Sequence, residues 1–142
     1  VLFSEIEEIY KNSDIISLHV PLDLETKNMI TIKEMKLMKK DVLLINTARG
    51  GIINERDLNI ALQEKLIAGA AIDVFEDEPY SGELVKHDHC ILTAHMGSMT
   101  ADCRARMEIE ATEEAIRFLK GVALKGKVPE DEYEIQRQRF IT

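Results

Sequence analysis

Four short apolar runs, separated from one another by segments with helical periodicity, constrain the fold of this chain more than any other feature. They predict strands at residues 14–20, 41–47, 70–75 and 90–95, and the segments around them predict helices at residues 4–12, 31–40, 54–67 and 100–120. Strands that alternate with helices pair in parallel through crossover connections. The sequence therefore predicts an α/β fold with part of a doubly wound parallel sheet, and its 142 residues amount to about one domain.

Capping signals mark where three of these helices begin. Ser4 with Glu7, and Thr31 with Glu34, have the spacing of a capping box. Asn54 is a candidate N-cap for the third helix.

Further signals concern burial and the ends of helices. Residues 41–47 are apolar at successive positions, which is typical of a strand buried on both faces. The third helix carries Leu58, Leu62 and Leu66 on one face, and Gly69 is expected to end it. The last helix is expected to end at Gly121 and to turn an apolar stripe inward. That stripe consists of Ala105, Ile109, Ile116 and Leu119.

Polar side chains that could bind a ligand or transfer a proton lie just after three of the predicted strands, or at their ends. They are Arg49, the pair Asp73 and Glu78, and His95. The carboxyl ends of parallel strands meet at one edge of a sheet, where ligands of such folds bind. An arginine can bind a carboxylate through two parallel hydrogen bonds. An imidazole beside a carboxylate can exchange a proton with a substrate hydroxyl. The pattern indicates a site for a small carboxylate.

Composition narrows the classes of partner. The formal net charge of -8 leaves no basic stripe for a nucleic acid and no polybasic stretch for an anionic membrane. No apolar run approaches the roughly 20 residues of a membrane span. Cys90 and Cys103 form no paired motif, which favours a reducing, cytoplasmic setting. His87 and His89, next to Cys90, are only a weak metal signal, and we expect no metal site.

Four stretches resemble the NAD-dependent D-2-hydroxyacid dehydrogenases, the family that includes phosphoglycerate, glycerate and D-lactate dehydrogenases. They occur in the family's order and at its usual spacing, and the resemblance covers roughly residues 4–121. The stretches are "SDIISLHVPLDLETKNMI", "LMKKDVLLINTARGGIINERDL", "GAAIDVFEDEP" and "ILTAHMGSMT". The resemblance implies a Rossmann-like NAD-binding domain, NAD as cofactor, a small 2-hydroxy or 2-keto acid as substrate, and a homodimer.

The resemblance also implies roles for individual residues. Arg49 matches the arginine that binds the substrate carboxylate, and His95 matches the acid/base histidine. Glu78 matches the glutamate that holds this histidine in one tautomer and favours its protonated form. The cofactor-binding positions that the resemblance implies are Thr47, Ala48, Arg49, Asp73, His95 and Gly97, with Asp73 accepting a hydrogen bond from the nicotinamide carboxamide.

One part of the family's pattern is missing. Its G-x-G-x-x-G turn, with an acidic residue about 20 positions further on, is not formed by any of the seven glycines. We therefore expect residues 1–121 to be the C-terminal portion of an NAD-binding domain. Residues 122–142 are expected to be an arm returning toward an absent substrate domain. We expect this piece alone to be inactive. A smaller departure is Ala94, where many members carry proline before the histidine.

Three functions remain open from the sequence. The first is a dehydrogenase. The second is a nicotinamide-sensing corepressor of the same fold, since such proteins keep the three catalytic-type residues, and the third is a remnant without activity. Glu78 argues against formate dehydrogenases, which resemble the family but carry glutamine at that position. Which 2-hydroxy acid is used, and whether the cofactor is NAD or NADP, would be decided by residues expected upstream of Val1.

Overall fold

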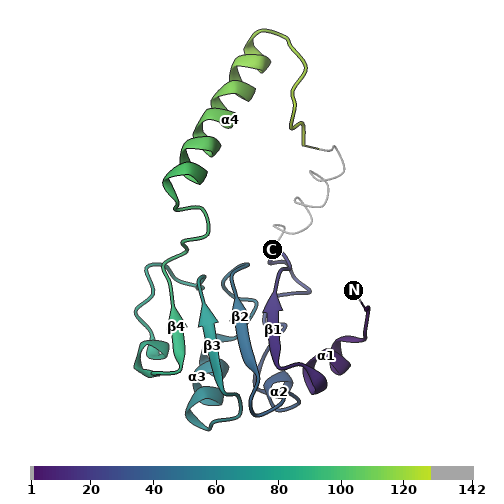
Figure 1. Ribbon diagram of the computed structural model, residues 1–142, viewed down its shortest axis with the longest axis vertical. Helices are drawn as coiled ribbons and strands as arrows, with labels where there is room; N and C mark the ends of the chain where they lie inside the picture. Colours follow the sequence, from purple (N-terminus) through teal and green to yellow (C-terminus); the bar gives the residue numbers. More distant parts are fainter. Residues whose placement is uncertain (1, 129–142) are drawn as a thin grey trace. The chain divides into compact units, whose positions relative to one another are not determined.

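A parallel sheet of four strands forms the centre of the first part of the chain (Figure 1). The computed structural model describes residues 2–128. The strands are β1 (Ile15–Leu18), β2 (Leu43–Asn46), β3 (Gly69–Ile72) and β4 (Cys90–Leu92), and their order in the sheet follows their order in the sequence. Every neighbouring pair is parallel, so the predicted parallel α/β architecture is confirmed.

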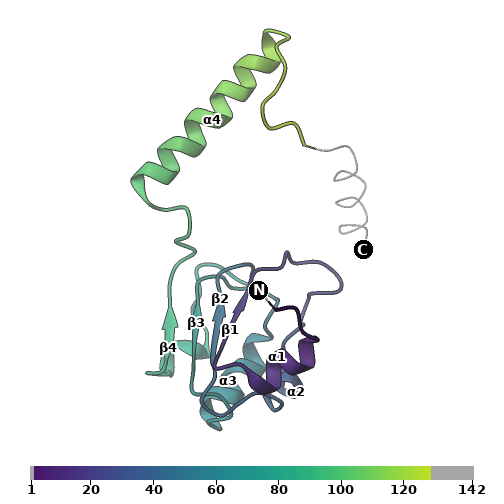
Figure 2. The same ribbon diagram turned by 45° about the vertical axis from the view of Figure 1, so that its right-hand side comes forward.

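Three helices lie against one face of this sheet (Figure 2). They are α1 (Ile6–Asn12), α2 (Ile32–Met35) and α3 (Glu55–Gln63), and a short 3₁₀ turn, η1 (Glu83–Lys86), precedes β4. Side chains alternate between the faces of a strand, and the side chains on the helix side form the core. They include Ile16, Leu18, Leu44 and Ile72, all at most 5% exposed.

The opposite face of the sheet differs from the expectation for residues 41–47. Leu43 is 45% exposed and lies in register with the exposed Ile15, while Leu44 is fully buried. The strand is therefore not buried on both faces among the described residues. Its uniform apolarity predicted a strand correctly but could not tell which neighbouring element covers each side.

Two of the three predicted helix starts are confirmed. Thr31 and Glu34 form the complete capping box of α2, and the Asn54 side chain accepts a hydrogen bond from the backbone N–H of Asp57. The capping box predicted for Ser4 and Glu7 is wrong. α1 begins one residue later, with Glu5 as its N-cap, so the Ser4 hydroxyl lies outside the position from which it could cap.

The predicted end of the third helix is also wrong. α3 ends at Gln63, and Lys65 follows with a left-handed φ of 55°. Leu66 consequently lies beyond the helix and packs against the core from the turn, while Leu58 and Leu62 are buried on the helix as predicted. Gly69 does not end the helix but begins β3.

A second compact unit begins at Gly97, after the first unit, Val1–Met96. It contains the long helix α4 (Ala101–Leu119), whose N-cap Thr100 and following Gly121, with φ of 66°, agree with the predicted bounds. None of its residues is buried, so the expected inward stripe is exposed among the described residues. Most of the predicted arm, residues 129–142, lies outside the described residues, and the division at residue 121 remains a prediction.

Candidate active site

Three loops at the carboxyl edge of the sheet bring Arg49, Glu78 and His95 around one cavity. Arg49 follows the last residue of β2 by three positions, Glu78 lies in the loop after β3, and His95 follows the last residue of β4 by three. All three line a cavity of about 460 Å³. The remaining lining residues are Leu22, Lys27, Gly50, Gly51, Phe75 and Glu76.

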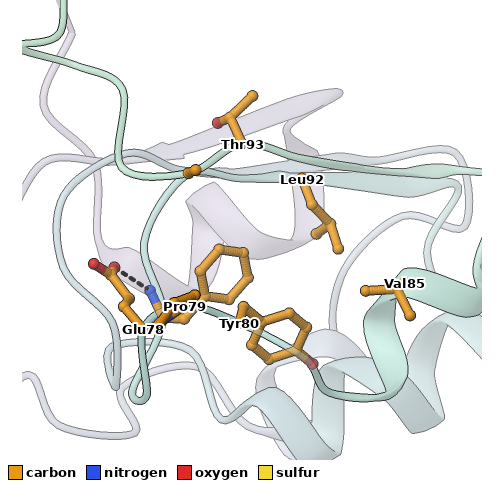
Figure 3. A pocket seen from close by; sticks show the side chains of 8 residues that line it. Glu78, Pro79, Tyr80, Val85, Leu92 and Thr93 are labelled. Atoms are coloured by element: carbon orange, nitrogen blue, oxygen red, sulfur yellow. Dashed lines mark hydrogen bonds between the residues drawn. The ribbon is translucent and has the colours of Figure 1, made fainter.

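His95 and Glu78 are directly hydrogen-bonded. The distance from His95 Nδ1 to Glu78 Oε2 is 3.1 Å. Glu78 Oε1 accepts a second hydrogen bond, also of 3.1 Å, from the backbone N–H of Phe75, which Figure 3 shows as a dashed line. The Phe75 N–H, followed by the bond from His95, holds the pKa of Glu78 below its usual value. An ionised carboxylate can only accept, so the proton of this bond belongs to Nδ1. The ring therefore presents Nε2 as the atom that can exchange a proton with a ligand.

Arg49 is positioned through its backbone. The side chain of Asn46 donates from Nδ2 to the carbonyl oxygen of Arg49 at 2.9 Å and accepts the N–H of Ala48 at 3.1 Å. Asn46 is only 2% exposed, so the last residue of β2 fixes the loop from within the core. The Arg49 side chain itself is exposed and donates from Nη1 to the carbonyl of Ala48 at 2.6 Å. Since a guanidinium has five N–H donors, this bond is compatible with binding a carboxylate.

Asp73 plays a similar part for the loop that carries His95. It is 8% exposed, and its Oδ1 accepts hydrogen bonds from Thr93 Oγ1 at 2.5 Å and from the N–H of Met96 at 2.8 Å. Its backbone oxygen accepts the N–H of His95 at 2.8 Å. A carboxylate offers about four acceptor sites, so these bonds are compatible with one more from a ligand amide.

The loops carrying Arg49 and Glu78 touch at Gly50. A Cβ at this position would lie 2.0 Å from the backbone oxygen of Phe75 and 2.6 Å from the backbone nitrogen of Glu76. Only glycine allows this approach, and the approach sets the spacing of Arg49 from Glu78.

Three of the six residues expected on the cofactor side line a second, smaller hollow at the ends of β1 and β2. Thr47, Ala48 and Arg49 face it together with His19, Val20 and Pro21, and its volume is about 300 Å³. The backbone and the side chains of Val20, Pro21 and Ala48 suit the face of a flat ring such as nicotinamide, whereas Asp73 is not among the lining residues of this hollow. Gly97 follows Met96 in the chain and belongs to the second unit.

An apolar cavity of about 590 Å³ adjoins the site and shares Phe75 and Glu78 with it (Figure 3). The rings of Phe75 and Tyr80 stack in its wall with their centroids 4.2 Å apart. The other lining residues are Pro79, Val85, Leu92, Thr93 and Ala94.

No three His, Cys, Asp or Glu side chains within residues 2–128 lie close enough together to hold a metal ion. His87 Nε2 lies 2.7 Å from the side-chain oxygen of Asn59, and His89 Nε2 lies 3.3 Å from the carbonyl of Leu62. Burial raises the pKa of the Cys90 thiol to about 11, which keeps it protonated and a poor ligand at neutral pH.

The sequence pattern identifies the side chains around the cavity but not two of the polar side chains that support them, the buried Asn46 and the exposed Thr93. It assigns these residues only to the predicted strands 41–47 and 90–95. For Asn46 the available signal is a polar residue at an inward-facing position of an otherwise apolar strand, because such a residue needs a hydrogen-bond partner.

Comparison with known proteins identifies relatives for most of the chain. The family described as "D-isomer specific 2-hydroxyacid dehydrogenase, NAD binding domain" matches residues 1–97. The glyoxylate reductase of Thermococcus litoralis is 47% identical over 120 residues, which are 84% of this chain and 36% of that protein. The D-3-phosphoglycerate dehydrogenase of Bacillus subtilis is 41% identical over 123 residues, or 86% of this chain and 23% of that protein.

Solved structures give the same result. The D-lactate dehydrogenase of Lactobacillus jensenii with NAD⁺ superposes with a TM-score of 0.82 at 28% identity, over 89% of this chain and 43% of that chain. The TT0316 protein of Thermus thermophilus superposes with a TM-score of 0.85 at 33% identity, over 89% and 41%. The chain thus spans between 23% and 43% of the length of these relatives.

Proposed function

The chain belongs to the D-isomer specific 2-hydroxyacid dehydrogenase family, and on this basis we propose that it carries the proton-transfer residues and the nicotinamide side of an oxidoreductase. The proposed enzyme transfers hydride between NAD(H) and a small D-2-hydroxy acid or the corresponding 2-keto acid. The observation that carries the proposal is the arrangement of Arg49, Glu78 and His95 around one cavity, with His95 Nδ1 bound to Glu78.

Each of these three residues has a distinct task in the proposed reaction. Arg49 binds the substrate carboxylate through its planar fork of donors. His95 Nε2 accepts the hydroxyl proton during oxidation, and in its protonated form it returns a proton to the keto oxygen during reduction. Glu78 fixes the tautomer and stabilises the imidazolium, since its lowered pKa keeps it ionised at neutral pH.

The proposed cofactor positions are Thr47, Ala48, Arg49, Asp73, His95 and Gly97. When bound, NAD supplies or accepts the hydride at the second carbon of the substrate. Thr47 and Ala48 would line one side of the nicotinamide, and Asp73 would accept from its carboxamide. Asp73 suits this task because its carboxylate is held by Thr93 and Met96 and is thus already oriented.

We further propose that the whole protein is a cytoplasmic homodimer. No helix among the described residues is long and apolar enough to cross a membrane. The apolar side chains of Ile109, Ile116 and Leu119 on α4 are between 44% and 82% exposed, and their burial against other protein surface would be favourable. Sedimentation of the full-length protein at tens of micromolar tests the dimer, and a purely monomeric species would contradict it.

The activity is tested by following NADH oxidation by the full-length protein with a series of small 2-keto acids such as glyoxylate. We expect turnover, and we expect His95→Ala to lower kcat by on the order of 10²- to 10⁴-fold, the usual contribution of one general acid or base. His89→Ala, at an exposed histidine outside the cavity, is the matched control and should retain activity. Binding of NADH without turnover of any 2-keto acid would instead support the corepressor alternative.

A further inference from the structure

His95 occupies an unfavourable backbone conformation that its surroundings must maintain. Its φ is 52°, in the left-handed region that residues with a Cβ rarely adopt. Such residues persist when neighbouring contacts fix them. Here Asp73 provides contacts on both sides, because its backbone oxygen accepts the N–H of His95 and its carboxylate accepts the N–H of Met96.

The orientation of the Asp73 carboxylate depends in turn on Thr93. The Thr93 hydroxyl donates to the same oxygen, Oδ1, that accepts the Met96 N–H. At 2.5 Å this bond lies at the short end of the range for O–H···O hydrogen bonds. The segment from Thr93 to Met96 is therefore bonded at three of its residues, Thr93, His95 and Met96, to Asp73, the residue that follows β3.

We propose that Thr93 is a positioning residue for His95. Its hydroxyl fixes the Asp73 carboxylate, the carboxylate holds the segment in its left-handed turn, and the turn aims His95 Nδ1 at Glu78. Thr93 touches neither substrate nor cofactor in this proposal. The inference rests on the proposed function, because it assigns to Thr93 a role in the proton transfer that His95 performs.

Replacing the Thr93 hydroxyl changes no charge near the imidazole. The charged groups that face His95 are Glu78, to which it is bonded, and Arg49, Lys27 and Glu76, which line the same cavity. Asp73 adds a carboxylate beneath the loop. All of them remain when Thr93 is changed, so any effect on His95 reports its position and not its electrostatic surroundings.

The test compares Thr93→Val, which removes the hydroxyl at nearly constant volume, with Thr93→Ser, which keeps it. In the full-length enzyme we expect Thr93→Val to lower kcat by about 10- to 100-fold, the size of effect that a misplacement of about 1 Å produces. The KM for the keto acid should change little, because Arg49 is held separately by Asn46. Thr93→Ser should restore kcat. Thr31→Val is the matched control, since the Thr31 hydroxyl also donates to a carboxylate, that of Glu34, at the start of α2 and outside the cavity.

A second measurement does not depend on activity. In protein without cofactor, the ring ¹⁵N chemical shifts of His95 report which nitrogen carries the proton. We expect one tautomer, with the proton on Nδ1, in the parent and in Thr93→Ser, and a mixture of tautomers in Thr93→Val. If Thr93→Val does not fold, Thr93→Ala, which only removes atoms, carries the same expectations.

The outcomes separate this inference from the proposed function. Unchanged kcat and unchanged ring shifts in Thr93→Val would overturn the positioning role, and so would a Thr93→Ser variant as impaired as Thr93→Val. A parent protein that turns over no 2-keto acid would overturn the proposed function, and the ring shifts would still decide whether Thr93 holds His95 in place.

Discussion

Gly50 provides the most direct test of how the site is assembled, because it lies where the loops of Arg49 and Glu78 meet. An alanine Cβ there would lie 2.0 Å from the oxygen of Phe75, whereas an ordinary contact begins at 3.4 Å. The difference between the two is 1.4 Å, and the obstructing atoms belong to the backbone, which has no rotamer to change. The Gly50→Ala substitution therefore pushes the two loops apart by an amount on the order of 1 Å.

This displacement separates the proposed carboxylate-binding group from the proposed proton-transfer pair. Misplacement of a positioning group by about 1 Å can cost about 100-fold in rate. We expect Gly50→Ala to lower kcat/KM for a 2-keto acid by about this factor in the full-length enzyme. Overpacking of a close contact costs about 1–3 kcal/mol, so the free energy of unfolding should fall by a similar amount. Steady-state kinetics and urea denaturation measure the two effects.

Two other glycines are controls for this substitution. Gly126 has no neighbouring atom within 4 Å of a built Cβ, so Gly126→Ala should behave as the parent. Gly51 has room, with its nearest atom 3.6 Å away, but its φ is 80°. Gly51→Ala should therefore lose about 1–2 kcal/mol of stability without separating the loops. A Gly50→Ala enzyme with parental kcat/KM would refute the claim that this contact sets the spacing of the site.

Three further substitutions test individual groups. Arg49→Lys should lower kcat/KM far more than it weakens NADH binding, because a point charge does not reproduce a bidentate fork; parental kinetics would reject the carboxylate-binding role. Glu78→Gln removes the carboxylate whose pKa the Phe75 N–H and the bond from His95 hold low. A glutamine side chain can offer either its oxygen or its NH₂ group to Nδ1, so the ring is no longer held in one tautomer and kcat should fall; an unchanged kcat would count against the pairing. Asn46→Asp keeps the acceptor for the Ala48 N–H but must carry a proton to donate to the Arg49 carbonyl. Because burial raises the pKa of a carboxyl, its activity and stability should be highest at low pH and fall as the pH rises through that raised pKa.

The strands were predictable because their apolar runs are short, β-rich and bounded by turn residues. Local signals also placed the starts of α2 and α3, since Thr31 and Asn54 cap their own helices. The end of α3 was not predictable from its leucines. Leu66 continues the spacing of Leu58 and Leu62, yet it packs against the core from a turn, because tertiary packing does not require an apolar residue to be helical.

The functional side chains were predictable for a different reason. Parallel strands direct their carboxyl ends to one edge, so polar residues just beyond several strands must lie near one another. The supports of these residues were not predictable in the same way, because each depends on a contact between loops. The approach of Gly50 to Phe75, for example, joins segments 25 residues apart in sequence and leaves no periodic pattern.

Asn46 and Asp73, the two buried polar residues within residues 2–128, explain how exposed loops can hold a defined geometry. They lie at the ends of neighbouring strands, and the N–H of Asp73 donates to the carbonyl of Asn46. A buried polar group without a partner costs about 1–3 kcal/mol. Asn46 finds its partners in the backbone of the Arg49 loop, and Asp73 accepts from the Met96 N–H and the Thr93 hydroxyl in the segment that carries His95. Displacing either loop would remove hydrogen bonds from a buried amide or carboxylate. The sheet itself therefore resists movement of the two side chains that the proposed reaction must keep at a fixed separation.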